Sequence, residues 1–423
     1  MYHSSRLKNG IQLFVHPTVK FKTIMVQMIF HRHLREEDVT MSALLPAVLM
    51  RGSVDYPSRM VLAHRLEELY GTELMSEVTK KGEQQLISFT LDLVHDQFLP
   101  GENQLLKQAL AIFNDIITNP VLEDGHFRTE IVNQEKEQHE KVINGLINDK
   151  IAYSVERCLQ EMCEDEPFGV FKYGSAERLK EITAASLYSF YQQFLAESPV
   201  ELHIIGDVEP EAIKALAAEI FSFKRSDGEP VPKTQVNVKS GEVQYLTENL
   251  DVSQSKLVLG FRTGSSYADD GYFSLLMYNG ILGSFPHSKL FQNVREKASL
   301  AYYAYCRLEK HKGLMLISSG IEGKNYHQTL EIIRKQVDDM AKGDFSQEDF
   351  DNTRNGVRNQ FLVEEDNPGL VINRVVDGML AGRHEDTSEL LRRLDAVTPE
   401  DVARVAERIK LDTVYFLTKK GGA

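Results

Sequence analysis

The 423-residue sequence contains no tryptophan and only three cysteines. Cys158, Cys163 and Cys306 form neither a C-x-x-C pair nor an even set, which excludes a disulfide scaffold and a cysteine-based zinc module. No apolar run approaches the ~18–20 residues that a membrane-spanning helix needs. The first residues also lack the apolar stretch of a signal peptide. We therefore expect a cytoplasmic protein that makes no contact with a membrane.

The sequence also has no excess of basic residues. The chain has 48 lysines and arginines against 62 aspartates and glutamates, giving a net charge of −14. Binding to a phosphate backbone requires a concentrated basic face, so we expect no nucleic-acid partner. The apolar fraction of 42% and the charged fraction of 26% are those of a globular protein. A chain of this length suits two domains of about 200 residues each.

Two segments near the ends of the two halves echo one another. Residues 179–187 and 394–402 both contain a threonine that suits a helix N-cap, Thr183 and Thr398, and both precede an apolar, strand-like stretch. The two threonines are 215 residues apart. A second echo links residues 42–53 with residues 273–284, at an offset of 231. A duplicated α+β domain explains both echoes.

A charged stretch with Pro230 and Pro232 lies between the halves and has no apolar period, which is typical of an exposed linker. We therefore expect an N-terminal half over residues 1–225, a linker over 226–240 and a C-terminal half over 241–423. Each half alternates strands and amphipathic helices, which favours a layered α/β sandwich. The strands are expected at 10–15, 23–30, 86–94, 200–206, 256–261, 300–308, 313–321 and 413–418, and the helices at 103–117, 209–221, 326–340 and 347–363.

The segment Met41–Ser53, MSALLPAVLMRGS, resembles a zinc-binding helix from which the ligands are missing. In the insulinase-like (pitrilysin-type) metallopeptidases that helix carries H-x-x-E-H, followed by a basic residue, a glycine and a small hydroxyl residue. Arg51, Gly52 and Ser53 match the end of this pattern. The two histidine positions then fall on Ala43 and Ala47, and the glutamate position falls on Pro46. Without the wider resemblance, the segment also fits an ordinary buried apolar helix.

These substitutions would remove the groups that bind zinc and activate water. Two histidines at i and i+4 can hold one Zn²⁺, and the glutamate between them activates water. Methyl groups and a proline ring offer no lone pair, so we expect this chain to bind no metal. The family's third ligand is a glutamate on another helix, for which Glu135 is the best candidate. We expect Glu135 to be an exposed charge in the run 135–141.

A second signature lies in the C-terminal half, in the segment that begins GILGSFPHSKLFQNVREKASLAYYAY at Gly280. It resembles the same family, in which an arginine and a tyrosine seven residues apart reach the zinc site of a facing domain. Arg295 and Tyr302 match both residue types and the spacing. The resemblance implies that they bind substrate and stabilise the developing oxyanion. The alternative is that Arg295 belongs to a solvated helix end and Tyr302 is a structural strand residue.

The resemblance implies a clamshell of two homologous halves and a role in a heterodimer. In the processing-peptidase branch one subunit carries H-x-x-E-H, while the other carries only the Arg/Tyr pair. We expect this chain to be the zinc-less subunit, inactive alone, with Zn²⁺ on the partner and an extended peptide as substrate. The alternative is a catalytically inactive scaffold or peptide-binding module of the same fold. Two stretches, 132–136 and 148–153, further resemble a Gram-positive branch labelled as associated with aminopentanol modification of elongation factor P.

Overall fold

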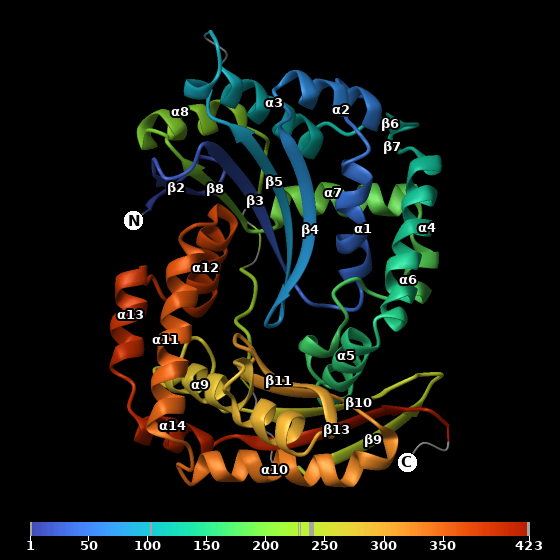
Figure 1. Cartoon of the computed structure of the whole chain (residues 1–423). Helices are drawn as coiled ribbons and strands as arrows, with labels where there is room; N and C mark the ends of the chain where they lie inside the picture. The colour runs from blue at the N-terminus through green and yellow to red at the C-terminus, as the bar shows by residue number, and fades with distance from the viewer. Residues whose placement is uncertain (1, 102–103, 227, 229, 237–240, 421–423) are drawn as a thin grey trace.

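The computed structural model describes residues 2–101, 104–226, 228, 230–236 and 241–420, which form two lobes of mixed α/β structure (Figure 1). Residues 227, 229 and 237–240 of the expected linker lie outside the described residues, and the rest of the linker is irregular coil. Within the described residues, no helix is both long and apolar enough to cross a bilayer.

The first lobe is built on a six-stranded sheet in the order β1-β2-β8-β3-β5-β4. Strands β2 and β8 run parallel, and every other neighbouring pair is antiparallel. The strands are β1 (His3–Arg6), β2 (Gln12–Pro17), β3 (Thr23–His33), β4 (Glu73–Lys81), β5 (Gln84–Val94) and β8 (Val200–Gly206). The helices of this lobe are α1 (Val39–Leu49), α2 (Arg59–Glu68), α3 (Leu105–Thr118), α4 (Thr129–Gly145), α6 (Ala176–Glu181), α7 (Ala184–Glu197) and α8 (Pro210–Ile220). A short hairpin of β6 (Leu122–Glu123) and β7 (His126–Phe127) completes it.

The second lobe is built on a five-stranded sheet in the order β11-β12-β10-β13-β9. Its strands are β9 (Gln244–Asn249), β10 (Ser255–Arg262), β11 (Ala301–Glu309), β12 (Leu314–Ile321) and β13 (Lys410–Thr418). Its helices are α9 (Tyr272–Asn279), α10 (Tyr326–Ala341), α11 (Gln347–Glu364), α13 (Thr387–Asp395) and α14 (Pro399–Ala406), with π-helical turns η4 (Gly280–Ser284) and η5 (Phe291–Lys297). Five consecutive strands of the first sheet, β2-β8-β3-β5-β4, have their counterparts here in β9-β13-β10-β12-β11. In both sheets the first of these pairs is parallel, which confirms the predicted duplication.

The halves exchange one helix each. Helix α5 (Lys150–Met162) comes from the first half of the chain but packs on the second sheet. Its buried face joins a core that includes Val155, Leu159, Met162, Val258 and Tyr415. Gly260 on β10 permits this close approach, because a Cβ at that position would lie 2.8 Å from the sulfur of Met162.

Helix α12 (Pro368–Ala381) makes the reverse crossing and reaches the first sheet in Figure 1. Its Ile372 and Val376 are buried against Ile29, Leu86 and Ile205. The sequence-based division at residue 225 therefore places α5 in the N-terminal half and α12 in the C-terminal half. Each helix nevertheless packs on the sheet of the other half.

A buried ionic cluster joins the two lobes at the turns of two hairpins. Lys312, in the turn between β11 and β12, has a completely buried side chain that pairs with Glu83 at 2.5 Å and with Glu166 at 2.6 Å. Glu83 lies in the turn between β4 and β5 and accepts a hydrogen bond from the backbone of Gln235. Arg262 pairs with the other oxygen of Glu166 at 2.8 Å. Gln235 of the linker is thus held between the two turns, since Lys312 donates a hydrogen bond to its carbonyl.

Candidate functional site

Helix α1 places the three degenerate motif positions on the first lobe. The helix is almost wholly apolar and packs among α4, α6, α7, β4 and β5. Ala43 and Pro46 are buried, and Ala47 is half-buried. Pro46 stands inside the helix, where it supplies no N–H for the carbonyl of Ser42. None of these side chains carries an atom that could ligate a metal.

Glu135 on α4 is buried beside this helix, so the expectation of an exposed charge is wrong. The residue is only 5% exposed. Its Oε1 forms an ion pair with Nε of Arg51, just beyond the end of α1, and lies 4.0 Å from a guanidinium nitrogen of Arg59. The physical reason is that a buried carboxylate needs a counter-charge, and Arg51 provides it across the α1–α4 contact. The sequence did not reveal this burial, because Arg51, the residue that pairs with Glu135, lies 84 positions away in the chain.

His139 lies one turn after Glu135 on α4 and is also buried. Burial lowers the pKa of His139 below its ordinary value of 6.5, and its Nε2 donates a hydrogen bond to the carbonyl of Tyr173 at 2.8 Å. In the sequence, His139 and Glu140 begin an H-E-x-x-H pattern that fails at Ile143, so no metal site was expected here. The spacing of four residues between Glu135 and His139 puts both side chains on one face of α4.

Arg295 and Tyr302 lie on the second lobe and are both accessible. Arg295 belongs to η5, where its guanidinium lies 4.5 Å from the centre of the Phe291 ring, and its side chain is 44% exposed. Tyr302 is 71% exposed. The pairing of β11 with β12 shifts register between Ala301 and Tyr303, so Tyr302 lies in a bulge. Bulges turn a side chain away from the regular sheet direction.

The structure therefore places the two parts of the predicted site on opposite lobes. Helix α1 packs within the first lobe, whereas η5 packs on β11 and α10 of the second. Each part lies close to the outer edge strand of its own sheet, β4 in the first and β11 in the second. The degenerate motif positions and the Arg/Tyr pair thus belong to the helical layers and edges of two different sheets.

Comparison with known proteins connects this geometry to a family. A family model described as "Peptidase M16 inactive domain" matches residues 181–357. The "Probable inactive metalloprotease YmfF" of Bacillus subtilis (strain 168) is 36% identical over 414 residues, covering 98% of this chain and 97% of that protein. The chain belongs to the M16 (insulinase-like) peptidase family. The predicted family resemblance is thereby confirmed.

A solved structure shows the same fold over nearly the whole chain. A crystal structure of a conserved protein from Enterococcus faecalis V583 has a TM-score of 0.92 at 32% identity, with 99% of each chain covered. A second relative from Bacillus subtilis (strain 168) is described as a zinc protease. This "Uncharacterized zinc protease YmxG" is 20% identical over 306 residues, which cover 71% of this chain and 72% of that protein.

The zinc that the M16 family implies does not fit the residues of this chain. Zinc sites in proteins need nitrogen, sulfur or carboxylate donors from at least three side chains. Here two donor positions are alanines, and the remaining carboxylate, Glu135, already pairs with Arg51. No group of three or more histidines, cysteines, aspartates or glutamates in the described part of the chain is arranged to hold a metal ion. The guanidinium of Arg51 thus neutralises the carboxylate that the sequence offered as the candidate third ligand.

Replacing Arg51 with methionine is expected to lower the free energy of unfolding by about 2–3 kcal/mol, because Glu135 would lose its close counter-charge while remaining buried. Urea unfolding followed by circular dichroism measures this loss. The double variant Arg51→Met/Glu135→Gln should recover most of it. Arg59→Met is the control, since Arg59 lies farther from Glu135 and is mostly exposed. Equal stability of Arg51→Met and the unmutated chain would contradict this account of Glu135.

Proposed function

We propose that this chain is the zinc-less subunit of a two-chain metallopeptidase that works in the cytoplasm. A homologous partner with H-x-x-E-H would hold the zinc, and this chain would present Arg295 and Tyr302 to the substrate. The observation that carries the proposal is the exposed position of Tyr302 in a bulge of β11, next in the chain to the η5 turn that bears Arg295. An exposed tyrosine and a half-exposed arginine are available to a second molecule.

The chemistry of the pair suits peptide-bond hydrolysis. When water adds to the carbonyl carbon, the carbonyl oxygen gains negative charge. The guanidinium of Arg295 and the hydroxyl of Tyr302 can both donate hydrogen bonds to that oxygen, and the guanidinium keeps its charge at any working pH. The substrate would lie extended along a sheet edge, where main-chain hydrogen bonds give affinity without strict sequence choice. The edge strand β4, beside α1, offers such an edge.

The relatives support a pairing of unlike subunits. Bacillus subtilis (strain 168) has both a relative described as an inactive metalloprotease and one described as a zinc protease. A genome with both kinds of chain could assemble them into one peptidase. The degenerate α1 positions and the Arg51–Glu135 pair leave this chain dependent on such a partner for any hydrolysis.

The test is reconstitution from separately purified chains. This chain and an H-x-x-E-H relative from the same genome are assayed alone and mixed, against a library of fluorogenic peptides. We expect chelator-sensitive cleavage to rise strongly in the mixture, and one zinc per complex by elemental analysis. One equivalent of zinc in this chain alone, with chelator-sensitive cleavage, would overturn the proposal. So would a relative whose activity does not change when this chain is added.

A catalytically inactive scaffold or peptide-binding module is the second candidate. It is favoured by the description of the 36% identical relative as a probable inactive metalloprotease. In that case the complex would form, but Arg295 and Tyr302 would not affect the rate. Substitution of these two residues separates the two candidates.

A further inference from the structure

A second site lies on the second lobe. A cavity of about 640 Å³ opens between the N-terminus of α9, the C-terminal end of α13 and α14. None of the residues that line it belongs to α1, η5 or β11, so it is separate from the positions discussed above. Its volume lies within the range of about 300–1,000 Å³ that is typical of small-molecule sites.

Four arginines line this arginine pocket: Arg392, Arg393, Arg404 and Arg408. Such a concentration of positive charge stands out in a chain with a net charge of −14. Two of the acidic residues that line the pocket are engaged in hydrogen bonds within the protein. Asp269 accepts hydrogen bonds from the backbone and hydroxyl of Ser266. Asp401 forms the capping box of α14 with Thr398.

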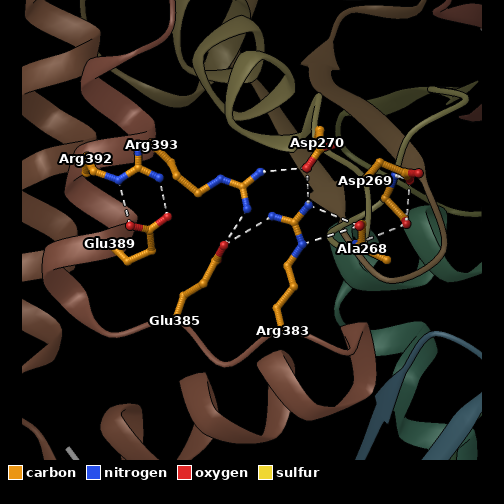
Figure 2. Close-up of polar contacts among 9 residues, drawn as sticks. Ala268, Asp269, Asp270, Arg383, Glu385, Glu389, Arg392 and Arg393 are labelled. Carbon is orange, nitrogen blue, oxygen red and sulfur yellow. Dashed lines mark hydrogen bonds and ion pairs between the residues drawn. The ribbon is translucent and has the colours of Figure 1, made fainter.

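Arg393 is held in position at the pocket wall (Figure 2). One of its terminal nitrogens pairs with Glu385, and the guanidinium lies 5.0 Å from the centre of the Phe273 ring. Its other terminal nitrogen points toward Asp270, 3.2 Å from Oδ1. A guanidinium fixed by an aromatic ring and a buried carboxylate loses little further freedom when it binds an anion.

Asp270 is the carboxylate that a bound anion would replace. It is fully exposed, and Figure 2 shows it near the guanidinium groups of Arg393 and Arg383, at 3.2 and 3.4 Å. Ion pairs of an exposed side chain at such distances contribute little to stability. A ligand with a higher charge density can therefore displace Asp270 from these arginines at little cost.

The rim of the pocket adds further donors. Arg392, Arg404 and Arg408 are exposed, and Arg392 pairs with Glu389 at 2.5 Å. Arg404 pairs with Asp401 at 2.8 Å, and Arg408 makes no ion pair with any side chain that the structure describes. At the α9 end, Gly271 is the N-cap residue, so no side chain caps the helix. The first N–H groups of α9, including those of the lining residues Phe273 and Ser274, add positive potential to the pocket.

We propose that the arginine pocket binds a small phosphate-bearing molecule, between pyrophosphate and a mononucleotide in size. Guanidinium groups match the oxygens of a phosphate group in pairs, and an uncapped helix N-terminus favours the same charge. Arg393 forms the fixed contact, and the rim arginines close around the outer oxygens. The ligand enters by displacing the carboxylate of Asp270.

The experiment uses the full chain and inorganic pyrophosphate, titrated by isothermal calorimetry at fixed ionic strength. We expect saturable binding of one pyrophosphate per chain. The double variant Arg404→Ala/Arg408→Ala should weaken it at least tenfold, and both residues are exposed, so folding should persist. Asp270→Asn should strengthen binding about threefold or more, because a competing carboxylate is removed. The control is Arg178→Ala on the first lobe, an exposed arginine that pairs with a carboxylate three residues away, Glu181, as Arg404 pairs with Asp401. It should leave the affinity within twofold.

Three results would overturn the proposal. The first is the absence of saturable pyrophosphate binding. The second is an affinity that falls as much in Arg178→Ala as in the rim variant, which would indicate general attraction to surface charge. The third is citrate binding as tightly as pyrophosphate at the same ionic strength, since that would assign the pocket to carboxylates. The proposal would be supported by weaker pyrophosphate binding in the rim variant, stronger binding in Asp270→Asn and an unchanged affinity in Arg178→Ala.

Discussion

Replacing Arg295 with alanine, or Tyr302 with phenylalanine, should slow peptide hydrolysis by the complex with a zinc-bearing relative about 10²–10³-fold. Each substitution removes a hydrogen-bond donor aimed at the carbonyl oxygen that becomes negative in the transition state, and one such donor contributes about 2.7–4 kcal/mol. The loss should appear in kcat, because the donors act more strongly on the transition state than on the bound peptide. Steady-state kinetics of the reconstituted complex measures it.

Two matched controls lie on the same sheet. Tyr245→Phe changes a tyrosine of β9, at the opposite edge, which is 55% exposed. Arg307→Ala changes an accessible arginine of β11 that pairs with Glu309. Both should leave kcat within about twofold, and all four variants should associate with the partner as the unmutated chain does. A complex that forms normally and keeps its full rate in Arg295→Ala and Tyr302→Phe would assign this chain to the scaffold role.

Replacing Lys312 with methionine should lower the free energy of unfolding by about 3–5 kcal/mol. The lysine is completely buried and pairs with two carboxylates, Glu83 and Glu166. Its removal leaves Glu83 without a close positive partner, and such a loss is costly in a buried site. Urea unfolding at pH 7 measures the change.

The pH dependence provides a second readout of the same variant. Burial alone raises the pKa of Glu166, but the hydrogen bonds and charges of Lys312 and Arg262 lower it overall below its ordinary value of 4.5. A carboxyl group with a lowered pKa stabilises the folded state above pH 4.5, and this contribution is lost as the pH falls further. The advantage of the unmutated chain over Lys312→Met should therefore shrink below pH 4.5.

Two further variants separate charge from packing in this cluster. Lys324→Met alters an exposed lysine that pairs with Glu322, and it should leave the unfolding midpoint unchanged. The double variant Lys312→Met/Glu83→Gln removes the stranded carboxylate, while Glu166 keeps Arg262. It should be more stable than the single variant by about 1 kcal/mol or more. A double variant no more stable than the single one would show that the loss comes from the lysine's packing and not from the unpaired charge.

Most of the secondary structure could be predicted from the sequence, because apolar period and capping residues act locally. The predicted strands and helices are present with end shifts of up to three residues. Strands β1, β4 and β9 were missed, as were several helices, among them α4, α5 and α12. Strand β4 shows why. Its sequence ELMSEVTKK has few β-branched residues, and as an edge strand it buries only Val78. The bulge at Tyr302 and the π-helical form of η5 were also outside what a local pattern shows.

The predicted site could be derived only in part. The expected loss of two zinc ligands at Ala43 and Ala47, and of the water-activating carboxylate at Pro46, follows directly from side-chain chemistry. The burial of Glu135 does not, because it depends on Arg51, far away in the chain. The arginine pocket was likewise invisible, since its arginines lie among ordinary helix-end charges until α9, α13 and α14 meet. An amphipathic stripe such as that of α5 shows that a helix is buried, but not against which sheet.

The crossing of α5 sets an order of events during synthesis. Its apolar face packs on β10 and β13, and β13 is the final strand described, at residues 410–418. Until the ribosome has released that strand, the α5 segment has no complete surface to cover it. The apolar face of α5 therefore stays uncovered while residues 163–418 are synthesised, and exposed apolar surface of this kind makes a nascent chain prone to aggregation.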